Sequence, residues 1–418
     1  MFDNDVISSH IRLKSWRDFA TSALLKSTVE KEKKNGRFFM VFNGIKAWSE
    51  LMKLGLSVGN LRKDIDAFFK ENIIGEFEKV GLFSFLITPH SKEDIAEFLQ
   101  ASDDILLDQV LDTFCSDKVL KKSHGNYKLN TIIDGVAVSP RIFEDTLIDL
   151  FKNYAAALPA RLQGKFVQFS SGINLYNWDD ALTSKMYTQV RSAAFAFADV
   201  TRKPVKFLDV GCGNGYNTTA IWNAYFQNNL FKDSNGMRIF GIDPDRGLIN
   251  IAQNEFAKRA SKLTGQSREE IQKFEEYFPR FQVGDMMQIP YEDGFFDVVY
   301  ASQVLHWADP KKALKEMMRV TRAGGKIFGT ENFYPEANKY NDLHFKVVEG
   351  AYGLFWKKDL IQWAKDCGAQ EVKIVTPISI FLIKKGPANK PSTTLPTIEK
   401  EYYPDLSPLD VENLAVGV

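Results

Sequence analysis

The stretch from Val205 to Tyr216, V-K-F-L-D-V-G-C-G-N-G-Y, decides the fold of this chain. Its apolar residues Val205, Phe207, Leu208 and Val210 are typical of a strand that is buried on both faces. Three glycines follow at alternate positions, and glycine allows a tight turn in which a ligand can approach the backbone closely. The stretch therefore predicts a strand, a glycine loop and a helix, with a site for a nucleotide-like ligand at the turn.

The spacing of the glycines indicates which kind of ligand would bind. Gly211, Gly213 and Gly215 give G-x-G-x-G, whereas a dinucleotide-binding loop has its third glycine one residue later, where this chain has Tyr216. Asp209 precedes the glycines, and its carboxylate would repel a pyrophosphate. A glycine loop alone is a weak signal, because any tight strand-to-helix turn can use glycines, so the downstream residues must decide.

The order of strand, acidic residue and G-x-G-x-G resembles motif I of the class I S-adenosylmethionine-dependent methyltransferases. In that family the loop packs against the methionine and ribose parts of the cofactor. The resemblance implies S-adenosyl-L-methionine as the cofactor. It also implies cofactor-binding roles for the residues of the turn: Asp209, Gly211, Cys212, Gly213, Asn214 and Gly215.

A second acidic residue follows the next predicted strand, residues 237–242, in Asp243-Pro244. The family places here the carboxylate that accepts hydrogen bonds from both ribose hydroxyls, a role that suits two acceptor oxygens. The gap from Asp209 to Asp243 is longer than usual, so we interpret residues 227–236 as a loop insertion. The alternative is that Asp243 only caps the following helix.

Three further positions complete the cofactor site that the resemblance implies. Asp285 and Met286 follow the predicted strand 281–283, where the family has an acidic residue directed at the adenine amino group and an apolar neighbour against the ring. Ser302 lies in the segment after the fourth strand. Aromatic residues that would close over the cofactor are Tyr176 and Tyr187, with Trp178 and Met186 beside them; core packing is the alternative for these four.

Alternating strands and helices predict an α/β fold with a doubly wound, Rossmann-like methyltransferase sheet in residues 201–385. The last two predicted strands, 372–375 and 378–383, match the pair that ends this fold, in which the final strand is antiparallel. The predicted order before it is a helical extension in 1–64, a mainly helical winged-helix domain in 65–135 and a helical connector and cofactor lid in 136–200. A flexible tail is expected in 386–418, which is rich in Pro, Ser and Thr.

The segment 65–135 predicts helices followed by a hairpin, the order of a winged helix. Seven lysines and no arginines face twelve carboxylates between Ile65 and Ile133, so a phosphate backbone would be repelled and no nucleic-acid partner is expected. The V-G-L-F sequence at 80–83, the Ser91 capping box and the hairpin resemble the N-terminal dimerisation domain of small-molecule O-methyltransferases. This resemblance implies a homodimer.

Composition sets the remaining expectations. Lys+Arg 53 and Asp+Glu 53 give a formal net charge of zero, which provides no general attraction to nucleic acid or anionic membrane. Cys115, Cys212 and Cys367 are far apart, with no C-x-x-C pair and no secretory signal, so we expect a cytoplasmic protein without a disulfide framework or a metal site. No apolar run approaches the roughly 20 residues that span a bilayer.

The candidate general base is His306, in S-Q-V-L-H-W at 302–307. An imidazole with a reference pKa of about 6.5 can take a proton from a phenol or hydroxyl at cellular pH. Its position resembles that of the catalytic histidine of those O-methyltransferases, which usually continue with Asp-Trp, whereas Trp307 follows directly here. The sequence L-H-W-A-D-P also resembles that of quinone and sterol C-methyltransferases, in which this histidine need not be the base. A substrate-pocket or structural histidine is the alternative.

Glu331, just past strand five, and His344, in the segment that caps the substrate pocket in the family, are further catalytic candidates; a solvated surface role is the alternative for both. We expect a methyltransferase that modifies oxygen or carbon of a small, largely apolar or aromatic molecule. Two competing hypotheses keep the fold: methylation of a protein side chain, or cofactor binding without methyl transfer.

Overall fold

A computed structural model gives the structure of the protein. It describes residues 66–130, 145–166, 182–183, 185–200, 205–231, 238–334, 337, 339–348, 350–375 and 380–387. Tyr176, Trp178 and the expected extension 1–64 lie outside the described residues, as does the expected tail except for its first two residues. The chain divides into two units, Met1–Gly386 and Pro387–Val418. All that follows concerns the first.

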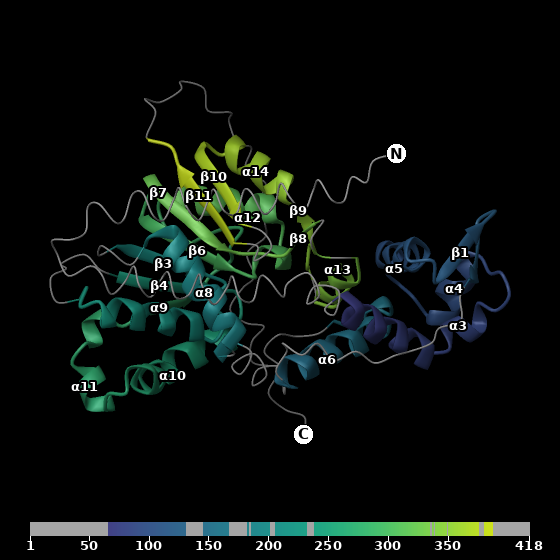
Figure 1. Ribbon diagram of the computed structural model, residues 1–418, viewed down its shortest axis with the longest axis horizontal. Coiled ribbons are helices and arrows are strands. Elements are labelled where there is room, and N and C mark those ends of the chain that lie inside the picture. Colours follow the sequence, from purple (N-terminus) through teal and green to yellow (C-terminus); the bar gives the residue numbers. More distant parts are fainter. Residues whose placement is uncertain are drawn as a thin grey trace, which may run out of the picture. The chain divides into compact units, whose positions relative to one another are not determined.

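A seven-stranded sheet forms the centre of the unit (Figure 1). Its strands are β3 (Lys206–Val210), β4 (Arg238–Asp243), β5 (Arg280–Val283), β6 (Phe296–Ser302), β7 (Thr321–Thr330), β10 (Ala369–Val375) and β11 (Ile380–Lys385). Their order is β10-β11-β7-β6-β3-β4-β5. The five strands from β7 to β5 are parallel, whereas β11 pairs antiparallel with both β7 and β10. The predicted Rossmann-like sheet and its antiparallel last strand are confirmed.

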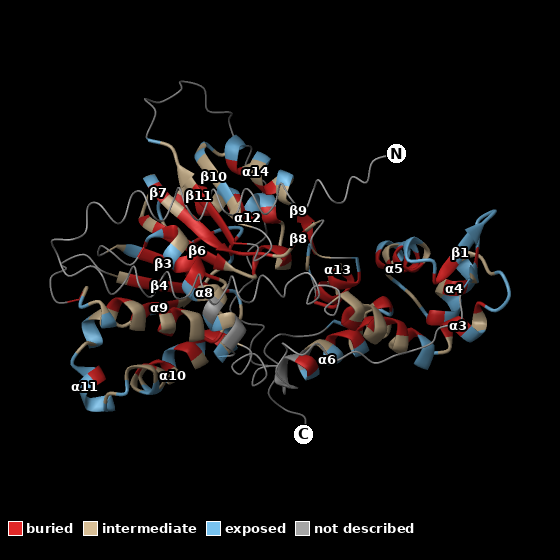
Figure 2. Ribbon diagram, viewed as in Figure 1, coloured by how far each residue is buried: buried red, intermediate tan, exposed pale blue. Residues whose placement is uncertain are grey.

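Helices cover both faces of this sheet (Figure 1). On one face lie α8 (Lys185–Ala198), α9 (Tyr216–Gln227) and α10 (Arg246–Thr264), and on the other α12 (Pro310–Val320) and α14 (Lys357–Asp366). Successive side chains of a strand point to opposite faces, so Phe207 enters the first core and Leu208 the second. Figure 2 shows the resulting burial of the central strands. This double burial explains why strand β3 has apolar residues at the successive positions Phe207 and Leu208.

The short connections complete the sheet unit. They are α11 (Arg268–Gln272), η1 (Glu275–Tyr277), η2 (Leu305–Trp307) and the parallel pair β8 (Phe333–Tyr334) and β9 (Phe355–Trp356). Asp309 caps α12 by accepting hydrogen bonds from the backbone of Lys311 and Lys312, as the Asp-Pro start predicts. Helix α12 thereby begins directly after η2, the segment that carries His306.

The N-terminal part contains the predicted succession of helices and a hairpin. Residues 66–79 are helical and precede α3 (Leu82–Phe85), α4 (Lys92–Leu99), α5 (Asp104–Ser116), the antiparallel pair β1 (Leu120–Ser123) and β2 (Asn126–Leu129), and α6 (Asp145–Leu162). Ser91 and Asp94 form the expected capping box at the start of α4. The hairpin turn at His124 and Gly125 has positive φ at both residues. Local sequence signals therefore fix each of these boundaries.

Helix α13 (Lys339–Phe345) joins this helical core, although it follows the sheet strands in sequence. Tyr340 and Leu343 are buried in one hydrophobic cluster with Phe77 and Phe114, and the Tyr340 hydroxyl donates to Asp117 over 3.1 Å. Residues of α13 thus carry the chain from the end of β7 into the helical unit. Within the described ranges, no helix is long and apolar enough to cross a membrane.

Candidate functional site

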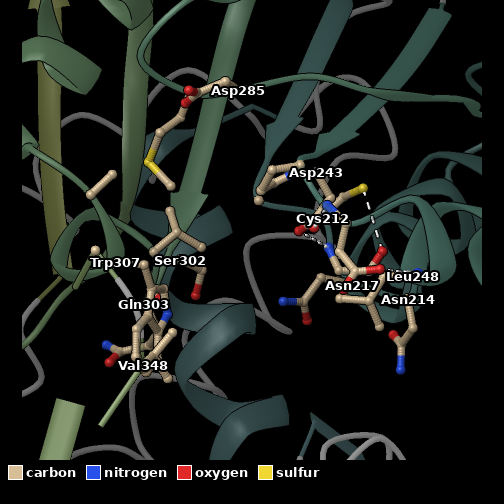
Figure 3. A pocket seen from close by; sticks show the side chains of 18 of the residues that line it. Cys212, Asn214, Asn217, Asp243, Leu248, Asp285, Ser302, Gln303, Trp307 and Val348 are labelled. Carbon is tan, nitrogen blue, oxygen red and sulfur yellow. Dashed lines mark hydrogen bonds between the residues drawn. The ribbon is translucent and has the colours of Figure 1, made fainter. Parts of the chain in front are cut away.

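A cavity of about 1150 Å³ opens at the carboxyl ends of the parallel strands. Open α/β sheets bind their ligands at this edge. Figure 3 shows residues of the glycine loop, such as Cys212 and Asn214, on one side of the cavity and Ser302, Gln303 and Trp307 on the other. The predicted site residues that line it are Tyr187, Gly211, Cys212, Gly213, Asn214, Asp243, Pro244, Asp285, Met286 and Ser302.

The three glycines of the loop all have positive φ, but the space around each of them differs. A Cβ on Gly211 would lie 2.7 Å from Cγ1 of Val304, so this turn must pass close to the β6 loop. A Cβ on Gly213 would meet nothing within 4 Å, which leaves open space beside the backbone where a ligand can approach. A Cβ on Gly215 would lie 2.7 Å from Cβ of Ala252, and Gly215 does not line the cavity. Gly215 allows close packing of α9 on α10, and its predicted cofactor contact stays a prediction.

Asp243 faces the cavity at the end of β4. Its Oδ2 accepts a hydrogen bond from the backbone N–H of Gly213, and its Oδ1 accepts one from Asp245, both at 3.0 Å (Figure 3). Burial raises the pKa of this carboxyl to about 6, against the lowering effect of those two bonds. The helix cap is Asp245, which accepts from the N–H of Leu248. Each Asp243 oxygen therefore keeps acceptor capacity for a ligand.

Asp209 does not face the cavity. Its carboxyl is buried under the glycine loop, where it accepts a hydrogen bond of 2.6 Å from the hydroxyl of Thr218. Burial raises its pKa to about 7, and the negative charge of Asp243 adds to the rise. The structure places Asp209 behind the loop, where it holds α9 through Thr218, and its predicted role toward the cofactor stays a prediction.

The wall opposite the glycine loop comes from the segment that follows β6. Ser302 Oγ lies 2.7 Å from Oγ1 of Thr330, which joins the ends of β6 and β7. Gln303 has φ 55, a left-handed conformation that is rare for a residue with a side chain and costs roughly 1–3 kcal/mol. Sequence reasoning did not assign several residues of the cavity wall, among them Asn217, Gln303, Trp307 and Val348. Gln303 and Trp307 directly follow the predicted site residues Ser302 and His306, and that proximity was the available signal.

His306 and Glu331 form a buried pair next to this wall. Nδ1 of His306 lies 2.7 Å from Oε1 of Glu331, and the two side chains are 1% and 0% exposed. Oε1 also accepts from the N–H of Asn332 over 2.8 Å, and Oε2 from the N–H of Leu305 over 2.9 Å. Because a carboxylate only accepts, it holds the proton of the imidazole on Nδ1 and leaves Nε2 as the acceptor. The structure brings together two residues that the sequence suggested separately.

The Nε2 atom of His306 is buried and has no hydrogen-bond partner among the described residues. The ring lies between Phe345, at 4.0 Å between ring centroids, and Trp307, at 4.4 Å. Trp307 and the preceding Val304 line the cavity, while His306 itself does not. The His306 ring therefore lies behind Trp307, next to the cavity wall and not in it.

His344 is buried in an aromatic environment beyond Phe345. Its ring packs against Phe69 and Tyr154, each at 4.9 Å between centroids. Burial lowers its pKa to about 3, and the charge of His306 adds to this effect, so the imidazole is neutral near pH 7. The side chains of Glu331 and His344 are 0% and 1% exposed, so the solvated surface role considered for both is wrong.

Comparison with known proteins agrees with this geometry. A family model for the methyltransferase domain matches residues 208–329. The match shows a methyltransferase domain in residues 208–329. The match begins in β3 and ends in β7, so this domain comprises the glycine loop, Asp243, Asp285 and the segment with His306. Domains of this class take S-adenosyl-L-methionine as their cofactor.

Curated relatives of the methyltransferase domain differ in what they methylate. Norajmaline N-methyltransferase of Rauvolfia serpentina is 26% identical over 46% of this chain and 62% of its own length. Demethylmenaquinone methyltransferase of Staphylococcus aureus is 30% identical over 41% of this chain and 66% of its own length. The chain spans less than two thirds of the length of these relatives.

Solved structures share the fold over a longer part of the chain. The DszA carbon methyltransferase has a TM-score of 0.61 and 14% identity, and covers 82% of this chain and 94% of its own. The CurJ carbon methyltransferase has a TM-score of 0.60 and 14% identity, and covers 83% of this chain and 99% of its own. At such identity the likeness concerns the fold, which extends well beyond the methyltransferase domain.

Proposed function

We propose that the protein is an S-adenosyl-L-methionine-dependent methyltransferase that acts on oxygen or carbon of a small, largely apolar or aromatic molecule. The observation that carries this proposal is the position of the His306–Glu331 pair directly behind the wall of the cavity that Asp243 and the glycine loop form. One edge of the sheet thereby joins a cofactor site to a proton acceptor.

The residues of the cavity fit the cofactor. Asp243 has free acceptor capacity for the two hydroxyls of a ribose, and the open space at Gly213 leaves room for the chain of the methionine part. Met286 supplies an apolar surface and Asp285 a carboxylate at the end where the adenine would bind. The cavity exceeds the usual range of about 300–1,000 Å³ for a single ligand. An acceptor molecule can therefore bind beside the cofactor.

S-adenosyl-L-methionine supplies a methyl group that is already activated by its sulfonium centre. The protein must hold the acceptor in line with that group, exclude water and remove a proton. We assign proton removal to Nε2 of His306, with Glu331 holding the proton on Nδ1 and stabilising the imidazolium that forms. Phe345 and Trp307 shield the base from water, and the aromatic and aliphatic wall, which includes Leu248, Trp307 and Val348, favours an apolar acceptor.

We propose carbon and oxygen as equal candidates for the atom that is methylated. The DszA and CurJ structures, which share the fold over more than four fifths of this chain, are carbon methyltransferases, and demethylmenaquinone methyltransferase is named for a quinone. An acidic C–H next to a carbonyl and a phenolic O–H both lose a proton to a neutral imidazole. The His306–Glu331 pair serves either acceptor.

We also propose that the helical unit in residues 65–135 is a winged-helix-like domain that pairs two copies of the chain. Its surface carries exposed apolar side chains, with Ile105 74% and Ile87 62% exposed, beside Phe98 at 40%. Sedimentation of the wild type and of an Ile87→Ser, Ile105→Ser variant tests this proposal. A dimer that the variant weakens supports it, and a monomeric wild type at micromolar concentration contradicts it.

Transfer of label from methyl-labelled S-adenosyl-L-methionine into an extract of the source cells tests the main proposal. The extract is then separated into organic-soluble and macromolecular fractions. Label in the organic fraction supports a small apolar acceptor and provides a compound to identify. Label in protein supports methylation of a protein side chain instead. Cofactor binding without transfer to either fraction supports a fold member that binds the cofactor for another purpose.

A further inference from the structure

Gln303 connects the wall of the cofactor cavity to the His306–Glu331 pair. Its left-handed backbone, φ 55, ends strand β6 at the cavity (Figure 3). A residue with a Cβ keeps such a conformation only where the surrounding contacts fix it. Those contacts are therefore expected to matter for the site.

The contacts of Gln303 converge on the two neighbours of Glu331. The backbone N–H of Gln303 donates to the carbonyl of Thr330 over 2.8 Å, and its Nε2 donates to the Thr330 hydroxyl over 3.4 Å. Its Oε1 accepts from the amide of Asn332 over 3.0 Å. One side chain thus holds the residues on either side of Glu331.

The same residue also contacts the other half of the pair. The carbonyl of Gln303 accepts a hydrogen bond of 3.1 Å from the indole N–H of Trp307, the direct neighbour of His306. Glu331 in turn accepts from the N–H of Leu305 on the other side of His306. The loop from Gln303 to Trp307 and the segment from Thr330 to Asn332 are therefore tied together at several points.

We propose that Gln303 is a positioning residue: its bonds to Thr330 and Asn332 hold Glu331 against His306 and couple this pair to occupancy of the cofactor cavity. Gln303 lines that cavity, so the residue that orients the base is within reach of a ligand bound there. This inference rests on the proposed role of His306 as the base. Gln303 itself contacts neither the proton that the base removes from the acceptor molecule nor the carboxylate of Glu331.

The test uses the full chain with ¹⁵N-labelled histidine, because only five histidines contribute signals. The signal of His306 is assigned by His306→Asn, and the probe is S-adenosyl-L-homocysteine. In the wild type, we expect the Nδ1 proton far downfield, as for an imidazole bonded to a carboxylate, and we expect the probe to shift it. Gln303→Ala should move this proton upfield and remove its response to the probe. The matched control is Gln362→Ala, which removes an exposed glutamine on α14.

Kinetics provide an independent readout once an acceptor is known. Gln303→Ala should lower kcat about tenfold, because misplacement of a catalytic group by a fraction of an ångström has an effect of this order, with little change in KM for the cofactor. Gln303→Gly, which accepts the backbone conformation, should lose the same signal and the same activity while folding more stably. Gln303→Gly also tests the proposal if Gln303→Ala fails to fold.

Unchanged His306 resonances and unchanged kcat in both variants would overturn the proposal. Full activity of Gln303→Gly with loss in Gln303→Ala would also overturn it, since only backbone strain would then matter. The nuclear magnetic resonance experiment does not depend on methyl transfer. A wild type that shows the bonded proton but transfers no methyl group therefore disproves the proposed function and not the positioning by Gln303.

Discussion

The two halves of the site hold their carboxylates differently. In the cofactor half, Asp243 accepts one backbone hydrogen bond on each oxygen and faces the cavity. In the catalytic half, Glu331 is completely buried and accepts three hydrogen bonds, from His306, Leu305 and Asn332. The first carboxylate faces the cavity with two of its roughly four acceptor sites used, whereas the second is buried with three of them used by the protein. Asp243 is therefore suited to binding and Glu331 to orienting His306.

The variant with the largest expected effect on this division of roles between Asp243 and Glu331 is His306→Asn. If His306 takes the proton, turnover should fall by roughly 10²–10⁴-fold, the usual contribution of a general base. Affinity for S-adenosyl-L-homocysteine should stay near that of the wild type, because His306 does not line the cavity. Label transfer measures the first quantity and calorimetry the second.

The matched control is His124→Asn in the exposed hairpin turn. His124 has φ 49, a conformation that asparagine tolerates, so this variant should behave as the wild type in both measurements. Full turnover of His306→Asn would reduce His306 to a structural residue and leave the catalytic half without a base.

Asp243→Ala tests the cofactor half. Hydrogen bonds to a charged acceptor contribute about 1.5–3 kcal/mol, so affinity for S-adenosyl-L-homocysteine should fall roughly 10–100-fold in calorimetry. Asp309→Asn is the control on the same cavity wall, because asparagine keeps the N-cap of α12. Equal affinity of Asp243→Ala and the wild type would remove the ribose assignment.

The pH dependence separates the two buried carboxyls at the end of β3 and β4. Burial raises the pKa of Asp243 to about 6 and that of Asp209 to about 7. Ribose hydroxyls donate to the ionised form of Asp243, so cofactor affinity should rise with pH through about 6 and level off above. Below this pH it should fall by up to about tenfold per unit.

Stability of the free protein should change in the opposite direction. The folded pKa values lie above the ordinary value for aspartate, so the stabilising contribution of the neutral carboxyls is present at low pH and is lost as the pH rises through about 7. Urea unfolding between pH 5 and 8 measures this slope. Asp209→Asn should flatten the stability slope up to about pH 7 and leave the affinity slope unchanged, whereas Asp243→Asn should flatten the affinity slope and only the part of the stability slope below about pH 6. If Asp209→Asn also flattens the affinity slope, the two carboxyls do not have separate roles.

The same comparison explains what the sequence could predict. The cofactor half is built from short motifs, so roles for Gly211, Gly213 and Asp243 could be predicted from the resemblance of these motifs to the methyltransferase family. The pair of His306 and Glu331 joins residues 25 positions apart at the ends of two neighbouring strands. No local pattern specifies that contact, because it depends on the register of β6 and β7.

Side-chain direction and distant packing were also beyond the sequence. Asp209 and Asp243 both belong to strands that lead to the site, yet only Asp243 faces the cavity, and the motif does not distinguish them. Helix α13 has its buried residues in the helical core formed by chain segments some 200 residues earlier, as the hydrogen bond from Tyr340 to Asp117, 223 positions away, illustrates. Hydrophobic periodicity predicts a buried face but not its partner.

The smallest expected effects concern the joint between the halves, where Gly211 meets Val304. Gly211→Ala places a methyl group 2.7 Å from Cγ1 of Val304 at a positive φ, so it should lower the free energy of unfolding by about 1–3 kcal/mol. Gly213→Ala has the same sign of φ but open space around it, so stability should change less, while its methyl group occupies space meant for the cofactor. Urea unfolding and calorimetry on both variants compare these effects, and Val304→Ala should partly restore the stability of Gly211→Ala. If Gly213→Ala is instead the less stable variant and binds the cofactor normally, the contact of Gly211 with Val304 does not join the two halves.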